Sequence, residues 1–229
     1  MVLYDFSIFK AMLEVDYKAL HKHDWDNFVV LTGEEGVGKS RLSLWALEIW
    51  LNLKYGSFQA DDFYKYVGIK VSEYARVLQS VKKGDINICD EAGDVFSGKH
   101  ALSKLVKKIE DTYTVVRGDN LLTIWSLPTF FMLTPYFRNW RIRSIWYIQK
   151  RGLCHVYHKP KRLLLSQTNE NTEIKDYFAV PPLFSFVYPD YKGVFLEPYL
   201  KMKGAKMQNV RDGFLKIAQE YDDEVSHNM

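Results

Sequence analysis

Residues 33–40 read Gly-Glu-Glu-Gly-Val-Gly-Lys-Ser and follow directly on the apolar run of residues 28–31. A G-x-x-x-x-G-K-S segment binds phosphate groups when it lies between a buried strand and a helix. Its glycines let backbone N–H groups turn toward the phosphate oxygens, and the start of the helix favours negative charge. The segment therefore predicts a phosphate-binding loop with a strand before it and a helix after it.

We expect this loop to bind ATP through its backbone and through two side chains. Lys39 would reach the β- and γ-phosphates, where it takes part in catalysis, and Ser40 would hold Mg²⁺. The helix that follows, over residues 39–53, is apolar on more than one side and should be largely buried. The residues expected to contact the nucleotide are Gly33, Glu34, Glu35, Gly36, Val37, Gly38, Lys39, Ser40 and Arg41.

A second apolar segment, residues 86–89, ends in the carboxylates Asp90 and Glu91. An Asp at the end of a buried strand can hold the Mg²⁺ shell, and a Glu beside it can polarise the water that attacks the γ-phosphate. An isolated Asp-Glu pair is more often a solvated loop, but its place after an apolar strand and downstream of the loop favours a site. We expect Asp90 to join Ser40 at the metal and Glu91 to be the catalytic base.

Helices and strands are expected to alternate along most of the chain. This alternation predicts an α/β fold with a mainly parallel sheet and helices on both faces. With 229 residues, 47% of them hydrophobic, the chain fits one P-loop ATPase domain over residues 1–229, with a core at about 25–150 and a C-terminal extension at 151–229. Expected helices lie at 6–20, 39–53, 73–82, 101–116 and 210–221, and expected strands at 28–32, 67–71, 86–90, 121–127, 144–148 and 153–157.

The cellular compartment is expected to be the cytoplasm, or the host cytoplasm or the virion if the protein is viral. No apolar stretch approaches the ~20 residues of a membrane span. The first residues lack the charged start and apolar core of a signal peptide. Cys89 and Cys154 fall in separate expected strands, which fits two free thiols in a reducing compartment.

The loop, the acidic strand and the later segment 125–143 together resemble P-loop ATPases that carry an additional catalytic glutamate. Within that class they are similar to the FtsK-HerA group of DNA-pumping motors, which includes viral genome-packaging ATPases. Phage and plasmid proteins related to the zonula occludens toxin resemble the chain about as well. The resemblance covers roughly residues 25–150 and implies a RecA-like fold and a homo-oligomeric ring such as a hexamer.

The same resemblance assigns further residues to the site. In that group the strand after the acidic motif commonly ends in a polar residue, often Gln, that senses the γ-phosphate, and Ser126 occupies the matching position here. Arginines recur downstream of that strand, and Arg138, Arg141 and Arg143 lie in the corresponding stretch. A guanidinium from a neighbouring subunit stabilises the transition state with a fixed charge. Arg143 is the first candidate and Arg138 the second, although a basic surface loop explains any single one equally well.

DNA is the partner that the distribution of basic residues suggests, while the net charge of +3 is too small to decide. Grouped lysines and arginines would suit phosphate contacts that do not depend on base sequence, and solvated faces are an equal alternative. The groups are Lys99, Lys104, Lys107 and Lys108, then Lys150, Arg151, Lys159, Lys161 and Arg162, and finally Lys201, Lys203 and Lys206.

These observations favour Mg²⁺-dependent ATP hydrolysis that drives DNA translocation, as in viral genome packaging or plasmid transfer. The alternative is a membrane-associated phage assembly or secretion ATPase of the zonula occludens toxin type. A small-molecule kinase is disfavoured, because a water-activating Glu91 has no use where the acceptor is not water.

Overall fold

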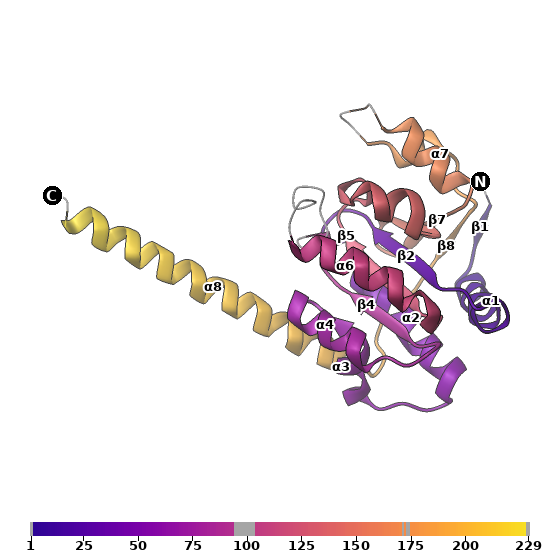
Figure 1. The fold of residues 1–229 in the computed structure, drawn as a ribbon, viewed down its shortest axis with the longest axis horizontal. Coiled ribbons are helices and arrows are strands. Elements are labelled where there is room, and N and C mark those ends of the chain that lie inside the picture. The colour runs from indigo at the N-terminus through magenta and orange to yellow at the C-terminus, as the bar shows by residue number, and fades with distance from the viewer. Residues whose placement is uncertain (1, 94–103, 171, 173–174, 228–229) are drawn as a thin grey trace.

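The computed structural model describes residues 2–93, 104–170, 172 and 175–227 (Figure 1). Within them, eight strands form one sheet in the order β1-β8-β7-β6-β2-β5-β4-β3. The strands are β1 (Leu3–Tyr4), β2 (Asn27–Thr32), β3 (Val67–Gly68), β4 (Ile86–Cys89), β5 (Leu122–Leu127), β6 (Ser144–Lys150), β7 (Leu153–His158) and β8 (Phe184–Val187).

The central strand is β2, which pairs in parallel with β5 on one side and with β6 on the other. Strands β4 and β3 continue the parallel pairing beyond β5. Only β7 runs against its two neighbours, β6 and β8, among the described strands. Every residue of β2 is buried, which explains why its sequence is a continuous apolar run without alternation.

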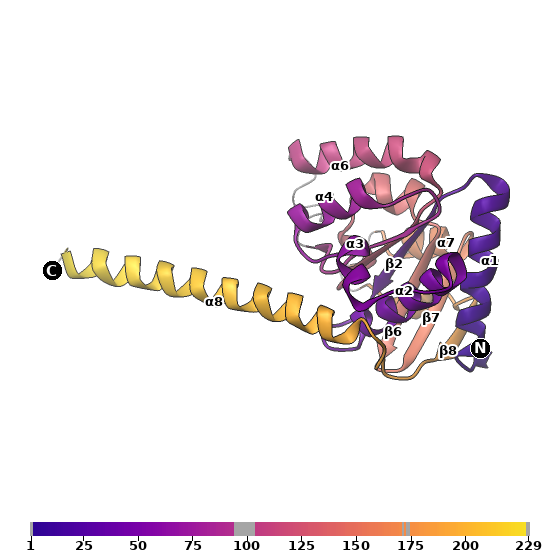
Figure 2. The same cartoon turned by 90° about the horizontal axis from the view of Figure 1, so that it is seen from below.

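Helices cover both faces of the sheet (Figure 2). Residues of α1, α2, α3 and the start of α8 pack into one apolar core, and residues of α4, α6 and α7 pack into a second core across the sheet. The expected mainly parallel sheet with helices on both faces is confirmed. The helices are α1 (Ser7–His23), α2 (Lys39–Tyr55), α3 (Phe63–Tyr66), α4 (Val71–Ser80), α6 (Lys104–Val115), α7 (Lys161–Thr168) and α8 (Leu196–His227), with short turns η1 (Ala60–Asp62), η3 (Val116–Asp119), η4 (Phe130–Met132), η5 (Phe137–Arg141) and η6 (Tyr177–Ala179).

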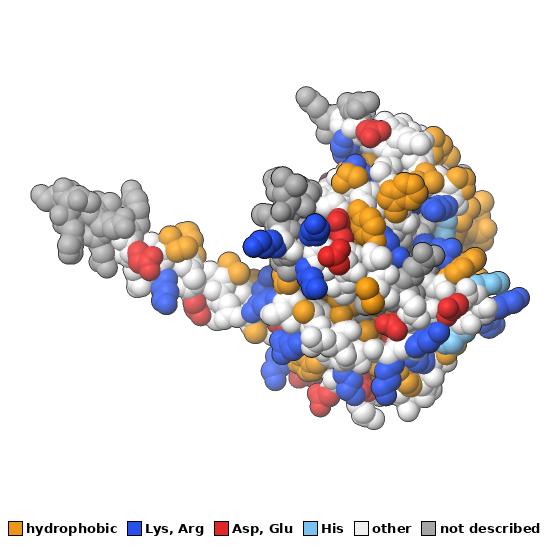
Figure 3. Space-filling model, in the orientation of Figure 1, with side chains coloured by type: hydrophobic (Ala, Val, Ile, Leu, Met, Phe, Trp, Pro, Cys, Tyr) orange, Lys and Arg blue, Asp and Glu red, His pale blue; other side chains and the backbone are white. Residues whose placement is uncertain are grey.

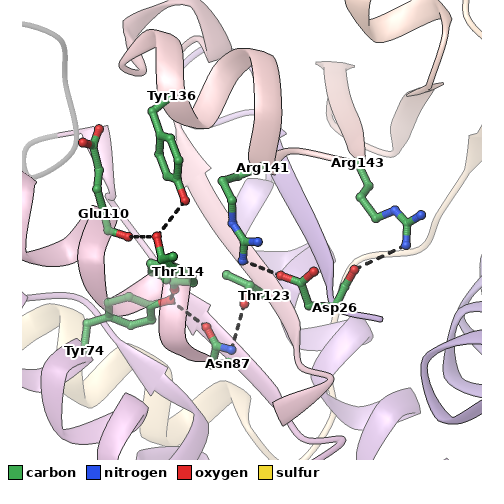
Figure 4. Close-up of polar contacts among 10 residues, drawn as sticks. Asp26, Tyr74, Asn87, Glu110, Thr114, Thr123, Tyr136, Arg141 and Arg143 are labelled. Carbon is green, nitrogen blue, oxygen red and sulfur yellow. Dashed lines mark hydrogen bonds and ion pairs between the residues drawn. The ribbon is translucent and has the colours of Figure 1, made fainter. Parts of the chain in front are cut away.

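A buried polar chain ties the second core to the sheet (Figure 4). The Tyr74 hydroxyl on α4 donates to the Asn87 side-chain oxygen at 2.6 Å, and the Asn87 amide donates to the Thr123 hydroxyl at 3.0 Å. Because β4 and β5 lie side by side, these bonds satisfy the amide of Asn87 inside the fold. The strand that carries the acidic pair is thereby held firmly against β5.

Several elements differ from their sequence-based boundaries. The expected strand 67–71 stops at Gly68, because the Glu73 side chain accepts hydrogen bonds from the N–H groups of Ile69 and Lys70 and starts α4 there. The expected closing helix 210–221 is part of the 32-residue α8, which begins at Leu196 and extends away from the body (Figures 1 and 2). Of the helix expected at 101–116, α6 is seen from Lys104, and residues 101–103 lie outside the described part.

Candidate nucleotide site

The phosphate-binding loop lies between β2 and α2, as its sequence predicts. Three of its glycines have positive φ angles, 147° at Gly33, 77° at Gly36 and 103° at Gly38. A Cβ atom at Gly33 would lie 2.4 Å from the carbonyl oxygen of Ile148 on β6. The glycines are therefore required by backbone conformation and, at Gly33, by close approach of a neighbouring strand.

The start of α2 is open toward the loop. Gly38 is its N-cap residue and has no side chain to bond the first N–H groups. Lys39 Nζ donates to the carbonyl oxygens of Gly33 at 2.6 Å and Glu34 at 2.7 Å. Burial lowers the pKa of Lys39, against the charges of Asp90 and Glu35, which raise it. Free N–H groups at a helix start and a nearby ammonium group form an anion-binding site.

The side chains of Ser40 and Asp90 are hydrogen-bonded at the edge of the sheet where the parallel strands end. Ser40 Oγ donates to Asp90 Oδ2 at 2.9 Å, and the Tyr199 hydroxyl from α8 donates to the same oxygen at 3.0 Å. Asp90 is only 3% exposed. A hydroxyl and a carboxylate held together beside a phosphate-binding loop are the oxygen ligands that Mg²⁺ prefers, so these two residues fit the metal expected from the sequence.

Glu91 follows Asp90 and has an unusual backbone, with φ at 61°. Its Oε1 lies 3.5 Å from Nζ of Lys203, and its Oε2 bonds Nζ of Lys206, both from α8. Burial raises the pKa of Glu91, but the hydrogen bond and charge of Lys206 and the charge of Lys203 outweigh it, and the net pKa is lowered. Both carboxylate oxygens thus face ammonium groups.

Ser126 comes from β5, the strand between the loop strand β2 and the acidic strand β4. Its side-chain oxygen is buried and makes no hydrogen bond within the described residues. Because the three strands are parallel, their carboxyl ends lie at one edge of the sheet, and Ser126 emerges between the loop and the acidic pair. An unpaired buried hydroxyl at this point can donate to a ligand.

One cavity of about 600 Å³ brings these groups together. It is lined by the loop from Glu35 to Arg41 except Val37, by the acidic pair and by Ser126. Its size falls within the range of small-ligand sites. Arg41 lies at the rim, where its guanidinium donates to the Tyr191 carbonyl at 3.1 Å.

Some residues expected at the nucleotide do not line this cavity. Gly33 and Glu34 contribute carbonyl oxygens to Lys39 instead. Val37 packs its side chain against the first core. Loop residues that share a motif therefore divide between those that line the cavity and those that support the loop.

Arg143 lies at the opposite edge of the sheet from the loop, beside Asp26, whose contact with Arg143 is drawn in Figure 4. Its N–H donates to the Phe28 carbonyl near the start of β2. That point is roughly 16 Å along the strand from the loop, at about 3.3 Å per residue. The guanidinium lies 4.3 Å from the Trp25 ring centroid and donates to the Asp26 carbonyl at 3.4 Å. Arg143 therefore does not reach the cavity of its own chain.

The other two arginines of the same segment also lie outside the cavity. Arg141 forms an ion pair with the Asp26 carboxylate (Figure 4). Arg138 donates to the Phe131 carbonyl at 3.4 Å. Both guanidinium groups contact their own chain and stabilise the segment before β6.

Four cationic or phenolic residues at the site were not expected from the sequence. Arg151 lines the cavity and donates to the Gly36 carbonyl at 3.5 Å, because the hairpin after β6 turns at the same edge as the loop. Tyr199 and Lys203 line the cavity from α8, and Lys206 bonds Glu91. Because β6 runs parallel to β2, a residue that follows β6 lies at the same edge of the sheet as the loop, and this could have indicated Arg151. No local sequence pattern marks Tyr199, Lys203 or Lys206.

Three residues of the basic groups that suggested DNA contacts bond within the fold. Arg162 is 0% exposed, and its guanidinium donates to the carbonyl oxygens of Arg138 and Asn139. Lys203 and Lys206 face Glu91. On the face in Figure 3, the described lysines and arginines are interspersed with acidic and apolar side chains. Lys99 lies outside the described residues.

No protein-family model matches the sequence, and no curated protein matches it. A solved N-terminal domain of zonular occludens toxin from Neisseria meningitidis is 16% identical with a TM-score of 0.45, over 75% of this chain and 97% of that one. C. elegans PCH-2 is 14% identical with a TM-score of 0.44, over 66% of this chain and 45% of that one. None of the described helices has the length and apolar character needed to cross a membrane. Likenesses this weak leave the function to be argued from the site.

Proposed function

We propose that this chain is a Mg²⁺-dependent ATP hydrolase. The observation that carries the proposal is the contact between Ser40 and Asp90, with Glu91 next in the chain and Lys39 in the same cavity. Two separate motifs, 50 residues apart, place a hydroxyl and a carboxylate within hydrogen-bond distance beside one open helix start, an arrangement that suits a single ligand. Phosphates and a divalent cation match that combination of N–H groups, an ammonium group and oxygen ligands.

Each side chain has a role that follows from its place. Lys39 exchanges the carbonyl oxygens of its own loop for phosphate oxygens when ATP binds. Ser40 and Asp90 would hold Mg²⁺, which would supply positive charge beside the transferred phosphoryl group. Glu91 accepts the proton of the attacking water, and Ser126 donates its free hydroxyl toward the γ-phosphate.

Two substitutions test this function. Lys39→Ala should abolish detectable binding of a fluorescent ATP analogue, because the loop loses its only side-chain cation for the phosphates within the motif. Glu91→Gln should bind the analogue normally and lower kcat by roughly 10²–10⁴-fold, because an amide cannot accept the proton. Asp61→Asn, on the exposed turn η1, is the control. Normal turnover in Glu91→Gln would remove Glu91 from catalysis.

We further propose that ATP hydrolysis drives assembly or secretion. This process has more support than DNA translocation. Several lysines and arginines expected at DNA are bonded within the fold. The distal part of α8 carries exposed apolar side chains, which favour a protein surface over a nucleic acid. They are Met207, Val210, Phe214, Leu215 and Ile217.

The hypothesis of DNA translocation is tested by the same measurement of ATP hydrolysis. A translocating motor should hydrolyse ATP several-fold faster with single- or double-stranded DNA at low salt, and the stimulation should fall steeply as salt is added. The exposed lysines of α6, Lys104, Lys107 and Lys108, are the group to replace with Gln, since they lie outside the cavity. A rate that DNA leaves unchanged would exclude the motor and favour the assembly ATPase, while a stimulated rate would reverse that preference.

A further inference from the structure

The first three turns of α8 lie directly over the acidic pair. Tyr199, Lys203 and Lys206 stand at positions i, i+4 and i+7, which places them on one face of the helix. All three contact the residues that follow β4. Tyr199 bonds Asp90, and the two lysines face Glu91.

One lysine lies beside each oxygen of the Glu91 carboxylate. Nζ of Lys203 is 3.5 Å from Oε1, and Nζ of Lys206 bonds Oε2. A carboxylate acts as a base only when one of its oxygens can accept a proton from water at hydrogen-bond distance. In this arrangement each oxygen already faces a cation.

The ion pairs are partly protected from solvent. The side chains of Lys206 and Glu91 are 21% and 36% exposed, and that of Lys203 is 38% exposed. Solvent screens such pairs less than it screens fully exposed ones. The contacts of α8 with the acidic pair come from its first turns, and the rest of the helix runs clear of the body (Figure 2). A small shift of α8 would therefore separate both lysines from Glu91 together.

We propose that Lys203 and Lys206 are positioning residues that hold Glu91 out of the reaction until α8 moves. The inference rests on the proposed function, because it assigns a regulation to the base of that ATPase. In the arrangement seen here the site can bind nucleotide through its loop and metal residues, while the base is held by α8. Hydrolysis then depends on the place of α8 as well as on ATP.

Steady-state ATP hydrolysis by full-length variants tests the proposal. Lys206→Ala should raise kcat about three- to tenfold with KM changed less than twofold, because Lys206 does not line the cavity and the loop and metal residues are untouched. Lys203→Ala with Lys206→Ala should raise kcat at least as much, and its KM can change as well because Lys203 lines the cavity. Lys206→Arg keeps the charge beside Glu91 and should return kcat to within twofold of the wild-type value. Lys216→Ala, on the exposed part of α8, is the control and should leave kcat unchanged.

A double variant separates this proposal from the proposed function. Glu91→Gln with Lys206→Ala should be as slow as Glu91→Gln alone, because the lysine acts only through the carboxylate. If kcat falls or is unchanged in Lys206→Ala while Glu91→Gln is inactive, the restraint is wrong and the base assignment stands. If Glu91→Gln turns over normally, the function itself fails.

Discussion

Gly33 in the loop and Glu91 in the acidic pair both have positive φ angles. Glu91 has a φ of 61°, which costs a non-glycine residue about 1 kcal/mol or more. Such strain persists where the surrounding structure holds the residue for a purpose. Gly33 has a φ of 147° and donates its N–H to the Pro128 carbonyl at 3.2 Å, which joins the loop to the end of β5.

Gly33→Ala is a direct test at the residue scale. The added methyl group would lie 2.4 Å from the Ile148 carbonyl oxygen, and the φ angle disfavours alanine. We expect a loss of about 1–3 kcal/mol in the free energy of unfolding, together with weaker binding of an ATP analogue. Gly213→Ala in α8, where nothing lies within 4 Å, should raise stability by a few tenths to 1 kcal/mol. Equal effects of the two substitutions in thermal unfolding would contradict this account.

At the scale of elements, apolar residues have different outcomes in α2 and α8. In α2 most of them are buried in the first core, with Trp50 at 0% exposure. In α8 the periodic residues beyond Lys206 are exposed, with Phe214 at 73%. Periodicity identifies a helix with an apolar face, but it does not say whether the surface that covers this face belongs to the same chain.

The packing of α1 against the start of β2 has a consequence for pH. Burial raises the pKa of Asp16 on α1 to about 6, against the charge of Arg143 and a hydrogen bond with Asn27, which lower it. An unfolded chain releases this proton near pH ~3.9. The contribution of protonated Asp16 to the free energy of unfolding is therefore fully present below pH ~3.9 and is lost as the pH rises through about 6.

Asp16→Asn should remove this loss. Because the amide never ionises, we expect Tm to rise by roughly 2–6 °C relative to wild type at pH 7.5 and by much less at pH 4.5. Thermal unfolding followed by circular dichroism at both pH values measures the difference, with Asp61→Asn as the exposed control. A gain of the same size at both pH values would show that charge is not its cause.

At the scale of the whole molecule, the arginines divide between the two edges of the sheet. Arg151 lies at the edge of the loop in its own chain, and Arg143 lies at the other edge. Arg143 can reach a nucleotide only in a neighbouring subunit, through a head-to-tail contact of the kind that forms rings. Its catalytic role remains a prediction of the resemblance.

Mixing inactive variants distinguishes the two arginines. If Arg143 acts in a neighbour, Arg143→Ala mixed with Lys39→Ala should recover part of the ATPase activity, where an intact loop meets an intact arginine. Arg151→Ala mixed with Lys39→Ala should recover none, because no chain in that mixture carries both residues. Absence of recovery in the first mixture, after co-assembly is demonstrated by light scattering, would rule out Arg143.

Local patterns in the sequence were sufficient to predict the loop, the acidic strand and the parallel sheet. The loop depends on the spacing of Gly33, Gly38 and Lys39, and the sheet on apolar runs of strand length between helical segments. Each of these signals lies within a few consecutive residues, because hydrogen bonds of helices and the turns of the loop form between near neighbours in the chain. The meeting of Ser40 with Asp90 follows from strand direction, since parallel strands end at one edge.

The cations around Glu91 were decided by tertiary structure alone. Tyr199 lies 109 positions from Asp90, and Lys206 lies 115 positions from Glu91. No periodicity in the sequence connects such distant residues, and the charge of a lysine group predicts solvent or DNA as readily as a carboxylate. Only the path of α8 over the carboxyl end of β4 brings these side chains to Asp90 and Glu91, because contact between them requires packing of whole elements.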